Sequence, residues 1–513
     1  MIKISNLNKT FGKKKVLDNL NCNIQTNSIY GLIGANGAGK STLLRIINDV
    51  FRKDSGSVLI DDVEVENNEE VKQKLAFLPD DLYIISSYTL MDMAKYYKSM
   101  YKKFENLKEM ITNTKKEFDE ALNNCGILRP KGSTIYTVDE AKRVANYLGY
   151  PVLVRPSYVL GGQGMAIAYD DKEIEEYVNE INTIEQEHPI LVDKYILGRE
   201  VEVDAICDGD DVLIPGIMEH LERAGVHSGD SISVYPTQNV EKEQEEKIIE
   251  YTEKIAKELN IIGILNIQFI ISNGEVYIIE VNPRSSRTVP YISKVTNLPM
   301  IDIATNVILG KKLKDLGYGT GLYKKSDYIC VKMPVFSFEK IKNADTSLGP
   351  EMKSTGEVLG VSKKFEDAVL KAFIASGANV STKGAILITV RDKDKPEMLP
   401  IAEKFKRKGF EIFATSGTAK FLRSNGVESI IIEKLWEGTN SIIDLIESGK
   451  INFVINTPTK GKESNRDGFK IRRMAVECKI PCFTSLDTVN ALYQAIEDET
   501  DETDLLPVDI TEI

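Results

Sequence analysis

The sequence has few cysteines and histidines, the residues that form disulfides and zinc sites. Its 513 residues include 6 cysteines, 3 histidines and 1 tryptophan. No two cysteines are spaced as Cys-x-x-Cys, which argues against a zinc site and a disulfide framework and favours reduced thiols. Cys478 and Cys482 are four residues apart, and we expect them on one helix face with no further ligands nearby.

Long hydrophobic runs and an excess of positive charge are also missing. No run of about 18 apolar residues is present, which argues against a membrane span. The first residues alternate as in a strand and do not resemble a secretory signal, so we expect a cytoplasmic protein. The formal net charge of −12 argues against broad nucleic-acid binding, although a local nucleotide site needs no basic surface.

The length predicts about three domains, because one hydrophobic core does not extend over so many residues. We place the blocks at 1–111, 112–378 and 379–513. The third block alternates strands, such as Ala385–Val390 and Phe453–Asn456, with amphipathic helices over Met398–Lys408 and Ile471–Glu477. This alternation predicts a small α/β domain with a parallel sheet. The whole chain is therefore expected to be a multidomain α/β protein.

The first block contains a phosphate-binding loop. Gly34 and Gly39 belong to a Gly-x4-Gly-Lys-Ser motif that follows an apolar strand and precedes a helix. Glycine lets backbone N–H groups turn toward phosphate, Lys40 would reach the β- and γ-phosphates, and Ser41 would bind Mg²⁺. In this strand–loop–helix setting, a chance match is a weak alternative.

This block resembles the N-terminal part of an ABC-transporter ATPase, with Phe11 where that family stacks an aromatic ring on adenine. The resemblance is incomplete. Asp80 stands where the family has a glutamine, and neither an LSGGQ-like signature nor a strand ending in Asp-Glu follows. We predict a truncated P-loop fragment that does not turn over ATP and that folds poorly or aggregates by itself.

The second block combines a glycine-rich loop with a candidate cation site. Arg155 ends a strand just before the loop at 157–165, where it could hold a phosphate. Glu280 and Asn282 are two residues apart on a strand and therefore face the same way, as a hard-cation site requires. A polar face on an edge strand is the plain alternative, but it fits poorly with the adjacent Arg284 and Arg287.

The turn at Asn273-Gly274 joins two strands of this block, and its length decides whether Gln268 lies beside Glu280 in the candidate cation site. A two-residue turn at Asn273-Gly274 would pair Gln268 with Ile279. We predict instead a three-residue loop with Gly274 left-handed in a G1 bulge, which pairs Gln268 with Glu280 and puts both side chains on one face.

Five segments of this block resemble the carbamoyl-phosphate synthetase large chain, specifically its second ATP-grasp half. They are VRPSYVLGG (154–162), VDAICDG (203–209), AGVHSGD (224–230), IEVNPR (279–284) and LGPEMKSTGEV (348–358). The resemblance implies an ATP-grasp α+β domain in which carbamate is phosphorylated by ATP to carbamoyl phosphate, for arginine and pyrimidine biosynthesis. It implies ATP and two Mg²⁺ or Mn²⁺ ions as cofactors, and carbamate, or bicarbonate and ammonia, as substrates.

The resemblance also implies roles for individual residues. ATP contacts are expected from Arg155, Lys194, Ile196, Glu200, Gly225, Val226, His227, Ser228, Gln268 and Glu280. The metal ligands would be Gln268, Glu280 and Asn282, and the catalytic arginines Arg155, Arg284 and Arg287.

The chain departs from this family in two ways. The first synthetase half and the leading domain of the second are absent, and Lys115 and Glu117 stand where the family has a basic pair. No glutaminase domain is present, so ammonia would come from elsewhere, for example from a glutaminase small chain.

The third block resembles the methylglyoxal-synthase-like regulatory domain of the same family, with a Rossmann-like α/β fold. The ATSGT segment (414–418) follows a strand and opens a helix, which suits a phosphate. By resemblance, a nucleotide monophosphate effector such as UMP would bind at Lys395, Thr415, Thr418, Lys434, Asn456 and Thr457. A helix cap with scattered solvated lysines is the alternative, and we see no catalytic carboxylate set.

Three functions stay open on the sequence. The first is a ligase unit of carbamoyl-phosphate synthetase type, active or inactive through truncation. The second is a non-catalytic fragment that binds ATP and a nucleotide effector. The third, an ABC-type transport ATPase subunit, is disfavoured by the missing signature and Walker B strand.

Overall fold

A computed structural model describes residues 1–12, 14–26, 39–72, 74–75, 120–156, 164–184, 190–340, 345–433, 442–458, 467–497 and 505–512. The chain divides into two compact units, Met1–Glu117 and Phe118–Ile513. Several predicted features lie outside the described residues, namely Gly34, Lys115, Glu117, Lys434 and residues 157–163. No helix in the described part of the chain is long and apolar enough to cross a membrane.

The first unit contains a sheet and two helices. Its described residues form four strands in the order β2-β1-β3-β4, with bounds β1 (Ile2–Phe11), β2 (Lys14–Ile24), β3 (Ser55–Ile60) and β4 (Val63–Glu64). The helices are α1 (Lys40–Ile47) and α2 (Glu69–Lys72). The apolar faces of these elements bury Ile4, Leu7, Leu43, Ile46 and Val58 together. This small core joins the helix that follows the predicted phosphate loop to the sheet.

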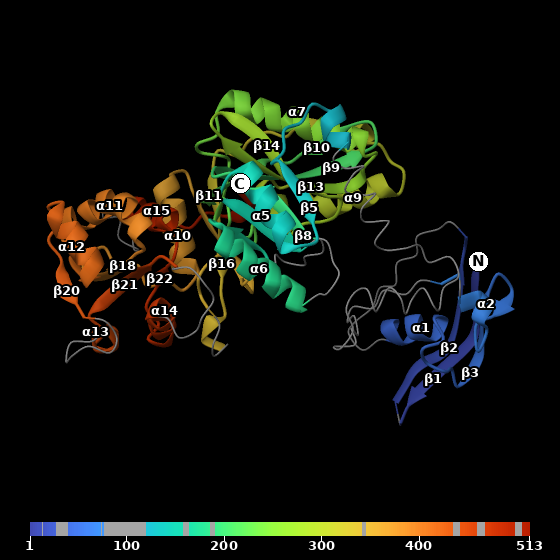
Figure 1. Ribbon diagram of the computed structural model, residues 1–513. Coiled ribbons are helices and arrows are strands. Elements are labelled where there is room, and N and C mark those ends of the chain that lie inside the picture. The colour runs from blue at the N-terminus through green and yellow to red at the C-terminus, as the bar shows by residue number, and fades with distance from the viewer. Residues whose placement is uncertain are drawn as a thin grey trace. The chain divides into compact units, whose positions relative to one another are not determined.

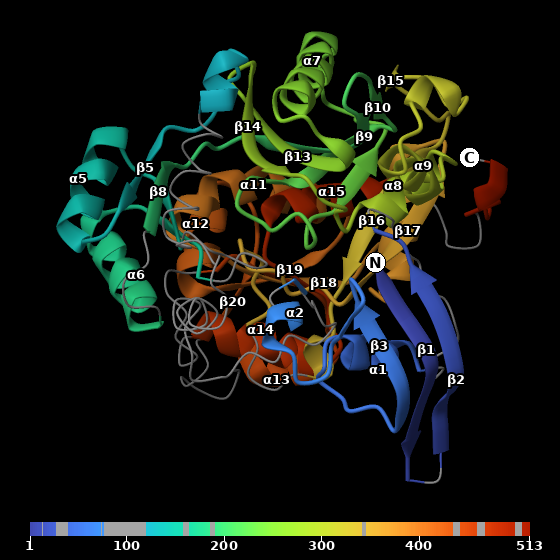
Figure 2. The ribbon, with the colours of Figure 1, turned by 90° about the vertical axis from the view of Figure 1, so that its right-hand side faces the viewer.

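The second unit begins with a small antiparallel sheet and two helices. Among the described residues, its order is β5-β8-β6-β7, formed by β5 (Gly132–Ile135), β6 (Val152–Pro156), β7 (Ala166–Ala168) and β8 (Ile190–Lys194). The helices are α5 (Val138–Leu148) and α6 (Asp171–Ile184), and both pack on this sheet (Figure 2). A capping box of Thr137 and Glu140 starts α5 by satisfying free backbone N–H groups.

A larger sheet follows, with the order β14-β13-β9-β11-β12-β16-β17 among the described strands and with β10 and β15 beside it. The strands are β9 (Arg199–Asp208), β10 (Val212–Ile214), β11 (Ile217–Arg223), β12 (Ser233–Tyr235), β13 (Ile262–Ser272), β14 (Glu275–Asn282), β15 (Gly321–Leu322), β16 (Ile329–Val335) and β17 (Gly356–Ser362). The helices are α7 (Lys242–Glu258), α8 (Val289–Val295), α9 (Met300–Ile308) and α10 (Phe365–Ala375).

Strand β9 shows how this sheet separates an apolar face from a polar one. Val201, Val203 and Ala205 are buried against α7, which lies over β13 and β14 (Figure 2). Successive strand residues point to opposite faces, so the intervening Glu202 and Asp204 face the other way. The candidate site is built on that second face.

The last part of the chain forms a parallel sheet with the described order β20-β19-β18-β21-β22. The strands are β18 (Ala385–Thr389), β19 (Glu411–Thr415), β20 (Ile430–Ile432), β21 (Ile451–Asn456) and β22 (Cys482–Phe483). The helices are α11 (Lys395–Arg407), α12 (Ser416–Ser424), α13 (Ile442–Glu447), α14 (Asp467–Glu477) and α15 (Leu486–Glu497), which surround the sheet (Figure 1). The predicted parallel α/β arrangement is confirmed.

Helices α10 and α15 connect this parallel sheet to the larger sheet. One continuous core contains Val234 of β12 and Val331 of β16 together with Phe373 of α10, Leu492 of α15 and Phe453 of β21. Since these buried side chains come from both parts, Phe118–Ile513 is one packed unit.

The predicted pairing of Gln268 with Glu280 is confirmed, but its predicted cause is wrong. The turn is a two-residue one, because Ser272 pairs with Glu275, and Asn273 and Gly274 have positive φ values of 51° and 81°. A β-bulge at Ile279 shifts the register, since Gln268 pairs with Glu280 while Phe269 pairs with Ile278. Asparagine and glycine both tolerate the left-handed conformation that such a tight turn requires.

The predicted shared helix face of Cys478 and Cys482 is also wrong. Cys478 follows the end of α14, and Cys482 begins β22. Lys479, with φ of 56°, reverses the chain between them.

Candidate functional site

A row of polar side chains crosses the inner face of the larger sheet. Glu280 of β14 pairs with Gln268 of β13, and Gln268 pairs with Glu202 of β9. On the next strands, His220 of β11 pairs with Ser233 of β12, which pairs with Lys332 of β16. Directly paired residues share one face, so this register brings polar groups from six strands into one row, and four of these groups are ionisable.

His220 is held between two carboxylates at the centre of this row. Its Nδ1 atom lies 3.3 Å from Glu200 Oε2, and its Nε2 atom lies 3.3 Å from Glu202 Oε2. Burial by itself lowers the pKa of this histidine, but the two carboxylates outweigh burial and raise the pKa to about 9. His220 is therefore a buried cation at neutral pH.

Asp204 lies on the same strand face of β9 as Glu202, but its surroundings favour the neutral form of its side chain. Burial, followed by the charge of Glu202, raises the pKa of Asp204 to about 7. Thr288 Oγ1 donates to its Oδ2 atom at 2.6 Å and Ser286 Oγ at 2.8 Å, while Asn266 Nδ2 donates to its Oδ1 atom at 3.0 Å. These donors satisfy a carboxyl group that would otherwise be costly to bury.

The predicted nucleotide loop lies directly after β11. The Gly225 N–H donates to Glu200 Oε1 at 3.3 Å, and the His227 N–H donates to the Gly349 carbonyl at 2.8 Å. Gly225 has φ of 107°, and a Cβ atom there would lie 3.1 Å from Ile167 of the small sheet and 3.2 Å from the Tyr195 hydroxyl. A side chain at this position would need its neighbours to shift and would be strained by the positive φ, so glycine is favoured here. Val226, the next residue, is half-buried.

Ser228 links the loop to the polar row. Gln268 Nε2 donates to Ser228 Oγ at 3.2 Å, and Lys332 Nζ donates to the Ser228 carbonyl at 3.1 Å. Lys332 is 1 % exposed, and burial lowers its pKa from the ordinary value. The loop and the sheet thus form one hydrogen-bonded arrangement.

The three candidate metal ligands lie on two adjacent strands. Asn282 pairs with Asn266, two residues along the strands from the pair of Gln268 and Glu280. Side chains two residues apart on a strand face the same way, so Glu280 and Asn282 share the face of Gln268. Asn282 Nδ2 donates to Asn266 Oδ1 at 3.5 Å. No group of three or more His, Cys, Asp or Glu side chains in the described residues is placed to hold a metal. A cation here would therefore use amide oxygens beside one carboxylate, which suits Mg²⁺ or Mn²⁺.

The two candidate arginines after β14 are exposed. Arg284 Nη1 donates to the Ser285 carbonyl at 3.2 Å. The charges of Arg287 and Glu280 both act on His227, whose pKa is lowered mainly by burial. Arg287 and Glu280 therefore lie close enough to His227 for their charges to act on its imidazole.

Three other candidates lie in the small sheet or directly after it. Arg155 Nε donates to Asp193 Oδ2 at 3.0 Å, and Lys194 Nζ donates to the Gly149 carbonyl at 2.7 Å. Ile196 is half-buried in the segment after β8. The Tyr195 hydroxyl donates to the Ala224 carbonyl, which joins this segment to the nucleotide loop. Within the described residues, no hydrogen bond or ion pair joins Arg155 or Lys194 to Gln268, Glu280 or Asn282.

The candidate effector residues lie at the carboxyl edge of the parallel sheet. Thr415 ends β19, and its hydroxyl lies 3.4 Å from that of Thr418 in α12. Lys395 Nζ donates to the Gly417 carbonyl at 3.0 Å. Asn456 ends β21, which lies on the other side of β18 from β19, and Thr457 Oγ1 accepts from the Arg391 N–H at 2.9 Å. Parallel sheets commonly bind ligands at this edge.

In the first unit, the described part of the predicted phosphate loop is its end. Gly39 has φ of 95°, and Lys40 and Ser41 open α1.

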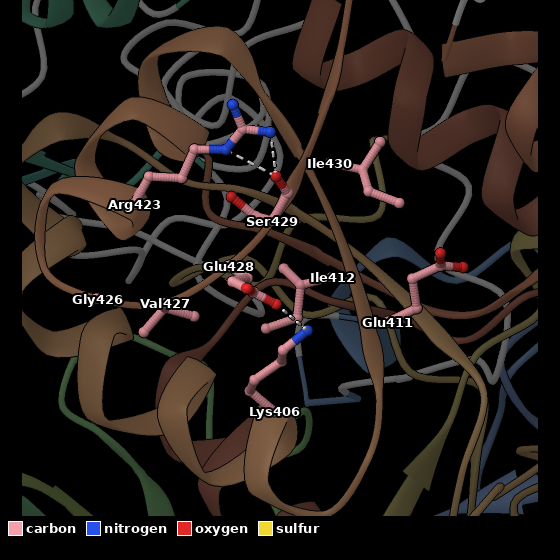
Figure 3. Close-up of a pocket in the computed structure, with 9 residues that line it drawn as sticks. All are labelled: Lys406, Glu411, Ile412, Arg423, Gly426, Val427, Glu428, Ser429 and Ile430. Atoms are coloured by element: carbon pink, nitrogen blue, oxygen red, sulfur yellow. Dashed lines mark hydrogen bonds and ion pairs between the residues drawn. The ribbon is translucent and has the colours of Figure 1, made fainter.

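A pocket of about 670 Å³ lies elsewhere on the parallel sheet, beside β20. None of the predicted site residues line it (Figure 3). Arg423 folds back onto the Ser429 carbonyl, and Lys406 pairs with Glu428 at 3.3 Å. Its basic groups are thus partnered within the chain.

Sequence reasoning missed several buried polar residues of the row, namely Glu202, Asp204, His220, Asn266, Thr288 and Lys332. One signal was available, because the stretch from Glu200 to Asp204 alternates acidic residues with valine. That period places three acids on one strand face.

Comparisons with known proteins match three parts of the chain, two of which overlap over residues 114–144. Residues 114–316 match the carbamoyl-phosphate synthase L chain ATP-binding domain, 397–484 the MGS-like domain and 17–144 the ABC transporter family. The carbamoyl phosphate synthase large chain of Lachnoclostridium phytofermentans is 56 % identical over 396 residues, or 77 % of this chain and 37 % of that protein. That of Agathobacter rectalis is 54 % identical over 397 residues, again 77 % and 37 %.

The chain is similar to the carbamoyl phosphate synthase large chain. Both resemblances seen in the motifs, the one to this synthase and the one to ABC-transporter ATPases, are confirmed. The chain spans only about a third of the length of these synthase relatives. Among solved structures, the biotin carboxylase domain of Hydrogenobacter thermophilus 2-oxoglutarate carboxylase is 21 % identical, with a TM-score of 0.39, over 49 % of this chain and 62 % of that one.

Proposed function

We propose that this chain is an ATP-grasp ligase unit of carbamoyl-phosphate synthase type, which phosphorylates carbamate with ATP to give carbamoyl phosphate. The observation that carries the proposal is the pairing of Gln268 with Glu280, with the Gly225–Ser228 loop attached to Gln268 through Ser228. A triphosphate placed between that loop and Glu280 would lie against both hydrogen-bond donors and cation ligands.

The residues divide the work by their chemistry. Gln268, Glu280 and Asn282 would hold two Mg²⁺ or Mn²⁺ ions, which offset the charge of the phosphates when bound. Arg155, Arg284 and Arg287 would compensate the charge of the transferred phosphoryl group, and Lys194, Ile196, Glu200 and Val226 would position ATP. The buried acids of β9 are compensated within the row by His220 and Lys332, which leaves Glu280 for the ligand.

The resemblance supports a setting for this reaction. The substrates would be ATP with carbamate, or with bicarbonate and ammonia supplied by a glutaminase small chain, and the product would enter arginine and pyrimidine biosynthesis. A nucleotide monophosphate such as UMP would bind at Lys395, Thr415, Thr418, Lys434, Asn456 and Thr457. The boundaries 1–111, 112–378 and 379–513 are retained as the proposed domains.

The test is ATP formation from ADP and carbamoyl phosphate in the purified full chain. This partial reaction needs the ATP-grasp site alone. We expect ATP formation, and we expect Glu280→Gln to reduce it by about 100-fold, since one charged ligand is lost from the transition state. Glu275→Gln is the matched control, because Glu275 lies on the same strand but pairs with Lys247 at the surface.

Two outcomes would contradict the proposal. If Glu275→Gln and Glu280→Gln reduced the rate of ATP formation equally, the role assigned to Glu280 would be wrong. A folded chain that binds MgADP but forms no ATP would support the alternative of a nucleotide-binding fragment without turnover. The incomplete span of the chain relative to its relatives makes that alternative worth testing.

A further inference from the structure

Gln268 lies between two carboxylates on the inner face of the larger sheet. It pairs with Glu280 of β14 on one side and with Glu202 of β9 on the other. A glutamine amide has one oxygen and one NH₂ group, and only the oxygen can bind a cation. The orientation of this amide therefore decides whether Gln268 is a cation ligand.

The carboxylate of Glu202 is already supplied with donors, so it does not need the Gln268 NH₂ group. Glu202 is 2 % exposed, and Asn266 Nδ2 donates to its Oε1 atom at 2.8 Å. The His220 imidazolium reaches its Oε2 atom through Nε2 at 3.3 Å. Both oxygens of this buried acid thus have a partner other than Gln268.

The Gln268 NH₂ group is bound by Ser228 of the nucleotide loop instead. Gln268 Nε2 donates to Ser228 Oγ at 3.2 Å, and among the described residues no donor is bonded to Gln268 Oε1. An amide that gives its NH₂ group to the loop keeps its oxygen for a cation beside Glu280. A hydroxyl can accept and donate at once, so Ser228 also keeps its own hydrogen for a nucleotide oxygen.

Ser228 is itself fixed from two other segments. Lys332 Nζ of β16 donates to the Ser228 carbonyl at 3.1 Å, and Lys332 is 1 % exposed. The carbonyl of the next residue, Gly229, accepts from Ser354 Oγ at 3.0 Å. A buried ammonium group needs such an acceptor. The residue whose backbone it holds is the one whose hydroxyl meets the glutamine.

We propose that Ser228, held by Lys332, is a positioning residue for the cation site, because its hydroxyl fixes the Gln268 amide with Oε1 toward the cation. The inference rests on the proposed function, since it requires a complex of nucleotide with Mg²⁺ or Mn²⁺ beside Glu280. Residues that orient a metal ligand without touching the metal change metal affinity by about 10–100-fold when they are removed.

The experiment measures by calorimetry how much Mn²⁺ strengthens the binding of ADP to the full chain. The readout is the Kd of ADP without metal divided by its Kd with saturating Mn²⁺, which cancels a direct contact of Ser228 with the nucleotide. We expect Ser228→Ala to lower this ratio by about tenfold, and Ser228→Thr, which keeps the hydroxyl, to retain it. Ser354→Ala is the matched control, because it removes a hydroxyl that holds the same turn at Gly229.

A second background separates positioning from a purely structural role. Gln268→Glu replaces the amide by a carboxylate, whose two oxygens are equivalent and need no orientation. In Gln268→Glu chains, Ser228→Ala should therefore change the ratio by less than about twofold. Lys332→Met should lower the ratio where Gln268 is present, and should add little to Ser228→Ala, because both changes act on one link.

The outcomes separate the inference from the proposed function. An unchanged ratio in Ser228→Ala, an equal loss in Ser354→Ala, or an equal loss with Gln268 and with Gln268→Glu overturns the inference while wild-type ATP formation stands. Absence of ADP binding to the folded wild-type chain, or a wild-type ratio of one, overturns the proposed cation site and the inference together. A thermal midpoint for each variant separates lost positioning from lost folding.

Discussion

The His220 imidazolium is the residue that makes the acidic face of β9 compatible with burial. Glu200 and Glu202 would repel each other in a region of low dielectric constant, and a cation between them removes that cost. Breaking such a cluster by removing one partner leaves an uncompensated buried charge, which is strongly destabilising. His220 therefore has a structural role on which its neighbour Glu200, a candidate ATP contact, depends.

A pH dependence of stability follows from His220. Its folded-state pKa of about 9 lies above the ordinary value of 6.5. The stabilisation is fully present below pH 6.5 and is lost as the pH rises through 9, a loss on the order of 3 kcal/mol. The pKa of Asp204 is also raised, from 3.8 to about 7, so its contribution to stability is lost over that lower pH range, as its ionisation adds negative charge beside Glu202. We expect the free energy of unfolding, from urea titrations, to fall between pH 6.5 and 9.

The variant His220→Gln tests the source of this slope. It should reduce the slope between pH 7 and 8.5 by about 1 kcal/mol per pH unit. His227→Gln is the control, because burial lowers the pKa of His227 and it stays neutral throughout this range. A slope that His220→Gln leaves unchanged would mean that the imidazole is not the titrating group.

At the scale of elements, the loop from Gly225 to Ser228 is fixed at three points that come from three different parts of the second unit. Glu200 of β9 holds its start, and Lys332 of β16 holds its end. Tyr195, which follows β8, donates to the Ala224 carbonyl just before the loop, and Ile167 of the small sheet would lie 3.1 Å from a Cβ atom at position 225. Glycine at position 225 allows the small sheet to approach so closely. The loop is therefore preorganised by its surroundings, which lowers the cost of ordering it around a ligand.

The variant Gly225→Ala should weaken nucleotide binding without unfolding the chain. The added Cβ meets Ile167 and Tyr195, and the φ of 107° adds strain of about 1–3 kcal/mol. We expect the calorimetric Kd of MgADP to rise by about tenfold, equivalent to about 1.4 kcal/mol. Gly274→Ala is the control, since Gly274 also has a positive φ but no atom lies within 4 Å of its added Cβ. Equal Kd values for the two variants would contradict the packing argument.

At the scale of the whole chain, the MGS-like part and the larger sheet share one core. Phe373 of α10 is 2 % exposed, and its ring contacts that of Phe483 edge-on at 5.9 Å. The same core contains Val234 and Met333 of the larger sheet. Burial of that kind couples the unfolding of both parts, because neither can lose its packing without exposing the other.

We therefore expect residues 118–513 to unfold cooperatively. In hydrogen exchange followed by mass spectrometry, peptides from β16 and β21 should lose protection at one denaturant concentration. Phe373→Ala should lower that denaturant concentration for both peptides, because the substitution reduces the free energy of unfolding by about 3–5 kcal/mol. Leu309→Ala, at a site 62 % exposed, should leave it unchanged. Loss of protection in β21 alone would show that the two parts unfold separately.

Three features could be predicted from the amino-acid sequence alone: the parallel sheet of the last block, the strand–turn–strand around Asn273 and Gly274, and the resemblance to carbamoyl phosphate synthase. These features depend on local periodicity, turn chemistry and motifs, which neighbouring residues in the chain encode. The pairing of Gln268 with Glu280 was also predicted, but through the wrong device, because a bulge at Ile279 gives the same register as a longer loop.

Only the tertiary structure decided which distant residues meet. The row from Glu280 to Lys332, the imidazolium of His220 between two acids, and the hydrogen bond from Lys332 to Ser228 each join segments far apart in the sequence. Register across a sheet and packing of a helix on it depend on the sum of many weak contacts. No single residue pattern specifies that sum, so these contacts become visible only in the folded chain.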